Sequence, residues 1–165
     1  MTLRISKILL VFAVAIYYSL VVFNNITDYG SNYQFVRHVM MMDSTFPGNR
    51  GMWRAVNSPA WHTAFYVSII AWEVVTALLC WWGGLRLAGT VRGTAPAFNR
   101  AKGLAITALT LALLMWLVAF ISVGGEWFLM WQSKAWNGEG TPFGMFGVIG
   151  IVLLFVAQSE TDGQP

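Results

Sequence analysis

The chain has 165 residues, the length of one domain, and ten Lys and Arg against seven Asp and Glu give it a formal net charge of +3. Hydrophobic residues make up 57% of the chain and charged residues only 10%, whereas a soluble domain carries about 25% charge. This composition excludes an ordinary soluble domain, because so apolar a chain cannot cover itself with a water-compatible surface, and lipid is its expected solvent. The basic residues form no stripe or basic helix, so nucleic acid is not an expected partner.

Four apolar runs predict an all-α membrane protein, a bundle of four transmembrane helices forming a single integral membrane domain over residues 1–165. The predicted spans cover residues 8–23, 60–87, 103–124 and 143–158. The first run follows Arg4 and Lys7 as a signal peptide would, but it ends without a small-residue cleavage site, so we expect it to be retained. Ser58 and Pro59 mark the start of the second span, and Thr141 and Pro142 repeat that pattern before the fourth.

The first connecting segment, residues 24–59, is too long to be a simple turn. Apolar residues at helical spacing predict a short amphipathic helix over Asn32 to Asp43, lying on the membrane or capping the bundle. A second short helix is expected over Met52 to Val56. The single cysteine, Cys80, lies inside an apolar run and excludes both an internal disulfide and C-x-x-C redox chemistry.

Positive charge favours an orientation with the N- and C-termini in the cytoplasm of a bacterial cell, across the inner membrane. That orientation leaves six Lys and Arg on the cytoplasmic side and four on the other. The six are Arg4, Lys7, Arg86, Arg92, Arg100 and Lys102.

Glu73 is a charge within the second span, roughly 12 to 20 Å along it. A charge at that depth costs about 2.5 kcal/mol or more, so Glu73 should face the bundle interior or be protonated. One interpretation is a proton or ion relay or a ligand counter-ion. The other is a neutral carboxyl group that is hydrogen-bonded to Tyr17, Tyr18 or a backbone carbonyl.

A Trp-rich segment follows the third span, with Trp127, Trp131 and Trp136 interleaved with Glu126, Gln132 and Asn137. Trp favours the membrane interface, so the segment is either an aromatic belt or a ligand or partner surface. Glu126 is expected to pair with an Arg of the first loop, Arg54 first and Arg37 second, because a guanidinium matches a carboxylate.

A third polar group on the same side contains Asn24, Asn25, Asp28, His38 and Asp43, which could meet Glu126. A metal site built from His38, Asp43 and Glu126 and a haem held by His38 and His62 are the two alternatives for these residues. We predict neither metal nor cofactor, and no catalytic residue. In the fourth span Gly144, Gly147 and Gly150 predict a face on which helices pack closely.

These polar strings resemble those of a bacterial family of predicted small integral membrane proteins of unknown function. The matching motifs are Asn24-Asn25-x-x-Asp28-Tyr29, Phe35-Val36-x-His38-Val39 and the long string from Gly124 to Gly138. The resemblance runs from about Lys7 to Val156 and implies a four-span inner-membrane protein. It implies no reaction, cofactor or catalytic residue.

The sequence therefore leaves three functions open. The first is a non-catalytic accessory or assembly subunit of a larger membrane complex, suggested by Gly-lined and Trp-lined surfaces. The second is a binder or carrier of a small solute, lipid or quinone, with its site above Glu73. An enzyme acting on a membrane substrate is the third, and the absence of a catalytic constellation makes a non-enzyme the favoured interpretation.

Overall fold

A computed structural model describes residues 1–161, which form helices and turns and contain no strand. Four helical segments are long and apolar enough to cross a membrane. They are α1 (Thr2–Thr27), α3 (Pro59–Gly89), α4 (Ala95–Leu114) continued by η2 (Met115–Trp127), and α5 (Gly140–Ala157). Three short elements complete the chain: α2 (Tyr29–Met41), η1 (Met52–Arg54) and η3 (Met130–Gln132). The predicted all-α membrane bundle is confirmed.

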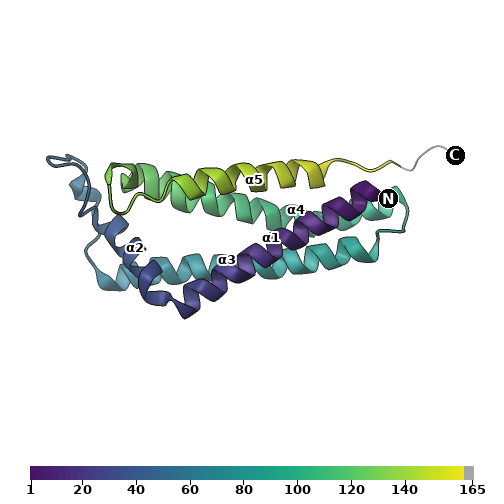
Figure 1. The fold of residues 1–165 in the computed structure, drawn as a ribbon, viewed down its shortest axis with the longest axis horizontal. Coiled ribbons are helices and arrows are strands. Elements are labelled where there is room, and N and C mark those ends of the chain that lie inside the picture. Colours follow the sequence, from purple (N-terminus) through teal and green to yellow (C-terminus); the bar gives the residue numbers. More distant parts are fainter. Residues whose placement is uncertain (162–165) are drawn as a thin grey trace.

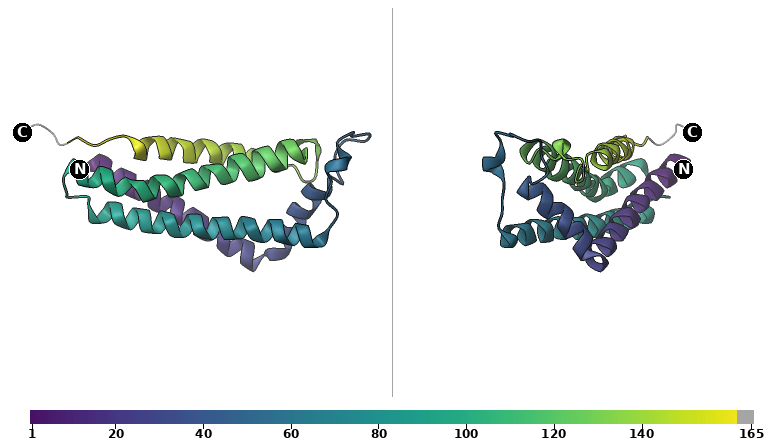
Figure 2. Two further views of the ribbon diagram at one scale, coloured as in Figure 1. Left: turned by 180° about the vertical axis from the view of Figure 1, so that it is seen from behind. Right: turned by 60° about the vertical axis from the view of Figure 1, so that its left-hand side comes forward.

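The four long segments run along the long axis of the molecule (Figure 1). Helix α1 begins, and the chain after α5 continues, at one end of the bundle, which we call the terminal end. Helix α2 and the loops of residues 42–58 and 128–139 lie at the other end, which we call the loop end. Helix α3 packs against both α1 and α4, and α5 packs against α4 and η2. Figure 2 shows α1 crossing the bundle obliquely, so that it lies beside α5 at the terminal end and moves away from it toward the loop end.

The first helix is longer than predicted, and the expected loop is shorter. Helix α1 continues through Asn24 and Asn25 to Thr27, and Asp28 alone separates it from α2. Two adjacent asparagines weaken an apolar run, which is why residues 24–27 were expected to leave the helix. They remain helical because Asn25 is buried and finds a partner on α3, a contact that hydropathy does not reveal.

The amphipathic helix predicted over Asn32 to Asp43 is α2, which begins a few residues earlier. Its apolar face buries Val36, Val39 and Met40 in a core at the loop end. It therefore caps the bundle. The second short helix shrinks to the single turn η1.

The predicted helix starts, in which a capping residue precedes a proline, are only partly found. Pro59 occupies the first turn of α3, as predicted, but the Ser58 side chain makes no capping hydrogen bond. Thr94 caps α4 instead, accepting a bond from the Ala97 N–H at 3.4 Å. Helix α5 begins at Gly140, two residues before Pro142.

The third span changes its winding partway. Residues 103–124 were expected to lie in one α-helix, but the helix begins at Ala95, and from Met115 to Trp127 it is a π-helix. The Ser122 hydroxyl donates to the Leu117 carbonyl, five residues earlier, at 2.8 Å. π-Helical winding is rare and often marks functional sites. The part of the third span that borders the loop-end core is therefore a candidate for such a site.

Close helix contacts use glycines other than the predicted ones. A methyl group added at Gly83 would lie 2.8 Å from the Ala105 backbone, and one at Gly84 would lie 2.6 Å from the Phe12 ring. Nothing lies within 4 Å of a methyl group at Gly144 or Gly147, and one at Gly150 would meet only a side-chain carbon of Leu113 at an ordinary 3.7 Å. The predicted close-packing face of α5 is therefore wrong within the described chain, and the contacts lie along α3 instead.

Candidate functional site

Glu73 lies in the middle of α3 and is only 4% exposed. The Asn25 side-chain amide of α1 donates to Glu73 Oε2 at 2.6 Å, and Asn25 is itself buried. The predicted partners were Tyr17, Tyr18 or a backbone carbonyl, and this was wrong. Tyr18 instead donates to the Ala112 carbonyl at 3.1 Å. Glu73 thus faces the bundle interior, as its membrane depth required, but its partner is the asparagine expected in a loop.

A cavity of about 60 Å³ borders Glu73, and we call it the polar cavity. Four elements meet there, and its lining residues are Asn25, Asn32, Phe35, Val36, Tyr66, Ile69, Glu73 and Phe120. A cavity of roughly 10–15 Å³ already holds one water, so this one has room for more. No donor among residues 1–161 bonds the second carboxylate oxygen, Glu73 Oε1. One oxygen of a buried carboxyl group is therefore left to whatever enters the cavity.

Part of the cavity wall is polar and part of it is apolar. Tyr66 donates its hydroxyl to the Asn25 backbone carbonyl at 3.1 Å, which holds Asn25 toward Glu73. A second, apolar space of about 20 Å³ shares Phe35, Val36, Ile69 and Phe120 with the first. The two spaces therefore share one apolar wall, while Asn25 and Glu73 give the larger space its polar groups.

Aromatic rings from α2 lie over the Tyr66 side of the cavity. The Tyr29 and Tyr33 rings lie 4.8 Å and 6.3 Å from the Tyr66 ring. Tyr29 is 38% exposed, so the tyrosine cluster extends from buried Tyr66 to the surface of the loop end.

The predicted Glu126 pair takes a different form. Arg54 reaches this segment, but its Nη1 donates to the backbone carbonyls of Glu126 at 3.3 Å and Trp127 at 3.0 Å. No Lys or Arg nitrogen among residues 1–161 lies within 4.0 Å of the Glu126 carboxylate, which is exposed. The carboxylate pairing was wrong. The carbonyls at the end of η2 are already electronegative and need donors, so they take the guanidinium.

The Arg54 guanidinium also lies against two indole rings. Its guanidinium carbon lies 5.7 Å from the Trp53 ring and 5.6 Å from the Trp127 ring, and the two rings meet edge to face. These contacts attach the long first loop to the end of η2.

We expect Arg54→Ala to loosen the first loop and Glu126→Ala to leave it in place. Arg54→Ala removes two charge-assisted hydrogen bonds at a half-buried position, for a cost of about 1 kcal/mol. Glu126→Ala keeps the carbonyl that Arg54 uses. Hydrogen exchange of residues 42–58 measures the difference, and equal protection in both variants would contradict this account.

His38 and Asp43, which were expected to meet Glu126, are instead joined to each other. His38 Nδ1 lies 2.6 Å from Asp43 Oδ2, and the imidazole stacks on the Trp136 indole at 4.5 Å with an interplanar angle of 7°. Glu126 does not join them, and residues 1–161 contain no group of three His, Cys, Asp or Glu side chains placed to hold a metal. His38 therefore fixes Trp136 over the end of α2.

The remaining predicted residues connect the two loops or lie exposed. The Gln132 side-chain carbonyl accepts from the Phe46 N–H at 3.2 Å and the Asn49 amide at 3.3 Å. Trp131 packs edge to face on Phe46 at 5.8 Å. Asn24, Asp28 and Asn137 are exposed, away from Glu73. The predicted polar cluster is thus several separate groups, of which only Asn25 and Glu73 form a buried site.

A family model described as predicted small integral membrane protein (DUF2165) matches residues 3–159. The chain belongs to this family. DUF2165 covers the whole bundle, including both residues of the buried pair. No curated protein and no solved structure matches the chain. Together with four apolar helices of sufficient length, the family makes this protein an integral membrane protein.

Of the eight residues that line the polar cavity, only Asn25 and Glu73 were predicted as site residues, and three of the other six show why. Tyr66 lies seven residues before Glu73, two helical turns away on the same face of α3, and that spacing was available from the sequence. Asn32 and Phe120 come from α2 and the π-helix, and only the packing of those elements brings them to Glu73.

Proposed function

We propose that this protein binds a small amphipathic molecule within the membrane, with the polar group of the ligand at Glu73. The observation that carries the proposal is the second carboxylate oxygen, Glu73 Oε1, which no donor among the described residues bonds and which borders a cavity of about 60 Å³. A ligand hydroxyl or amine would supply that donor.

The shape of the site supports an amphipathic ligand over a simple ion. Phe35, Val36, Ile69 and Phe120 form a shared wall between the polar cavity and the apolar space beside it. A ligand body lying along that wall would be shielded from water and from Glu73. Free fatty alcohols, quinols and small amines all combine a donor with an apolar body.

The orientation of the protein is part of the proposal. Arg4, Lys7, Arg86 and Lys102 all lie toward the terminal end of the bundle, which the positive-inside rule assigns to the cytoplasm of a bacterial cell. Both termini would then be cytoplasmic, and the polar cavity would open from the periplasmic half of the inner membrane.

The test is to identify what the purified protein carries. The tagged chain is extracted in a mild detergent, and organic extracts of the wild type and of Glu73→Leu are compared by mass spectrometry. We expect one hydroxyl- or amine-bearing amphiphile, near one per chain, in the wild type and its loss from Glu73→Leu. Identical contents in the two proteins would refute the proposal.

A matched control shows whether the ligand is lost because Glu73 in particular is removed or because any carboxylate is removed. Asp28→Asn removes a carboxylate that is exposed at the loop end and bonds only Ser31 among the described residues. It should keep the ligand. Phe120→Trp, which enlarges a residue of the shared wall, should reduce occupancy without touching Glu73.

A second candidate is a non-catalytic accessory or assembly subunit of a larger membrane complex. Its supporting observation is the open face of α5, where Gly144 and Gly147 have nothing near them and Val148 and Ile151 are exposed. Small residues let another helix approach closely in lipid. The same purification tests it, because a stoichiometric partner protein lost from Gly147→Leu would favour this function.

A further inference from the structure

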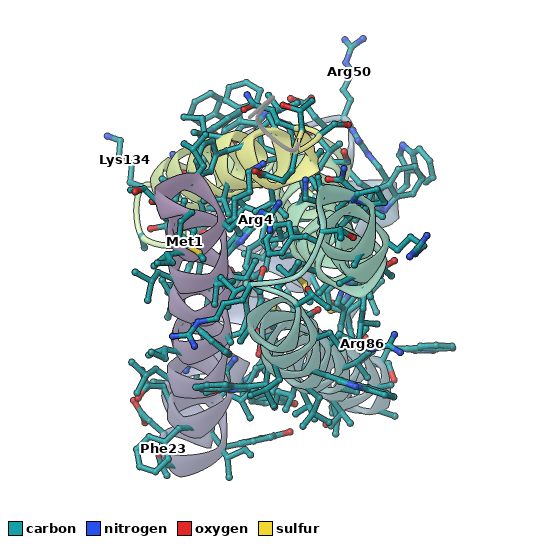
Figure 3. All side chains as sticks on the ribbon, turned by 90° about the vertical axis from the view of Figure 1, so that its right-hand side faces the viewer. Met1, Arg4, Phe23, Arg50, Arg86 and Lys134 are labelled. Atoms are coloured by element: carbon teal, nitrogen blue, oxygen red, sulfur yellow. The ribbon has the colours of Figure 1, made fainter. Side chains whose placement is uncertain are left out.

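Three cations are gathered at the terminal end, Arg4, Lys7 and Lys102, which we call the basic cluster. Lys7 on α1 and Lys102 on α4 are each 2% exposed, a burial that lysine adopts only when it is paired. Arg4 Nη1 donates to the carbonyls of Val91 and Gly93 at 3.2 Å and 2.6 Å. Figure 3, which views this end, shows Arg4 among the helices and Arg86 pointing away from them.

The segment that follows α5 is bound in this cluster. Lys7 Nζ lies 2.6 Å from Glu160 Oε1, and Lys102 Nζ lies 3.9 Å from the same oxygen. Arg4 Nε lies 3.9 Å from Glu160 Oε2. Both lysines also donate to the Gln158 carbonyl, at 2.7 Å and 2.5 Å.

Asn99 holds the backbone of the same segment. Its amide donates to the Glu160 carbonyl at 2.9 Å, and its side-chain carbonyl accepts from the Glu160 N–H at 2.9 Å. Burial alone would raise the pKa of the Glu160 carboxyl, but the Lys7 hydrogen bond and the charges of Lys7, Lys102 and Arg4 lower it below its ordinary value. The segment is therefore held as an acidic ligand would be.

The charges of this contact are unequal. Among residues 1–161, Glu160 brings one negative charge to the two buried lysines, Lys7 and Lys102, which approach each other closely enough to share one carbonyl. A phosphate group offers several acceptor oxygens around its charge, and Lys and Arg are its usual protein ligands. Aromatic rings border the cluster, with Phe98 5.2 Å from Arg4 and Phe155 5.4 Å from Lys7. Exposed Leu3 and Leu9 bring lipid to this level of α1.

We propose that the basic cluster is a binding site for a phosphate group, as found in acidic phospholipid headgroups and in soluble phosphate, and that Glu160 occupies it as the chain's own competing anion. The site is independent of the polar cavity, at the opposite end of the bundle. It would couple the release of the C-terminal segment to the anionic lipid content of the membrane.

The test compares Glu160→Gln with Asp28→Asn, which changes the net charge equally but at the loop end. Binding of phosphatidylglycerol to the detergent-solubilised full chain is titrated by native mass spectrometry. Phosphatidylcholine is the neutral lipid control. A parallel titration with inorganic phosphate is followed by ³¹P NMR. We expect phosphatidylglycerol to bind Glu160→Gln roughly tenfold more tightly than the wild type, equivalent to about 1.4 kcal/mol.

Each outcome is decisive. Tighter phosphatidylglycerol binding in Glu160→Gln alone supports a lipid headgroup site, and tighter inorganic phosphate binding alone supports a site for soluble phosphate. Equal affinities in the wild type, Glu160→Gln and Asp28→Asn for both ligands would overturn the proposal. Lys7→Met should cancel the gain when combined with Glu160→Gln. If that combination does not fold, the comparison of the single variants still decides.

Discussion

Asn25→Leu is expected to destabilise the protein by about 1–3 kcal/mol, because it leaves the Glu73 carboxyl group buried without its donor. The change removes the 2.6 Å bond to Glu73 Oε2 and one of two acceptors of the Tyr66 hydroxyl, while leucine keeps the branched shape of asparagine. Reversible unfolding in mixed micelles measures the free energy of unfolding.

Two variants make this prediction specific. Asn24→Leu, one residue away on the exposed side of α1, should change stability by no more than about 0.5 kcal/mol. The double variant Asn25→Leu with Glu73→Leu should recover part of the loss, because replacing both partners by apolar groups is close to neutral. Equal effects of the Asn24 and Asn25 substitutions, or strictly additive effects in the pair, would contradict a direct bond.

Gly83→Ala is expected to destabilise the contact between α3 and α4 by about 1–3 kcal/mol, as overpacking does. The added methyl group would lie 2.8 Å from the Cα and N atoms of Ala105, and backbone atoms cannot move aside as a side chain can. The two helices would have to separate along their contact. The same unfolding measurement reports the loss.

Gly147→Ala is the matched control for this prediction. It makes the same chemical change in a spanning helix where nothing lies within 4 Å, so it isolates the helix propensity that favours Ala over Gly by about 1 kcal/mol. Gly147→Ala should therefore be neutral or stabilising. Gly83→Ala as stable as Gly147→Ala would show that the two helices adapt freely at this contact.

The buried pair also explains why the polar motif at the end of α1 matters to the proposed function. Asn25 holds Glu73 Oε2, and Oε1 is left without a donor among the described residues, on a side chain that lines the cavity. A ligand that donates to Oε1 would complete the hydrogen bonds of the carboxyl group. Ligand binding and the stability of the α1–α3 contact are then expected to rise together.

The sequence by itself determined that the chain lies in lipid, how many spans it has and where the capping helix lies. Apolar content along four runs is a local and additive property, so hydropathy finds the spans without knowledge of packing. The 3.6-residue period of Val36, Val39 and Met40 likewise identified α2 from one segment alone. The same motifs were sufficient to indicate the family.

Only the tertiary structure decided the site. Asn25 and Glu73 are 48 residues apart, and their bond depends on the crossing and rotation of α1 against α3, which no single segment specifies. Arg54 donates to backbone carbonyls and not to the Glu126 carboxylate, because the end of η2 places carbonyl acceptors within its reach. Glu160 reaches Lys7 because the start of α1 and the segment that follows α5 lie at the same end of the bundle. Polar partners in a membrane bundle are fixed by helix orientation, whereas hydropathy fixes only which segments enter the lipid.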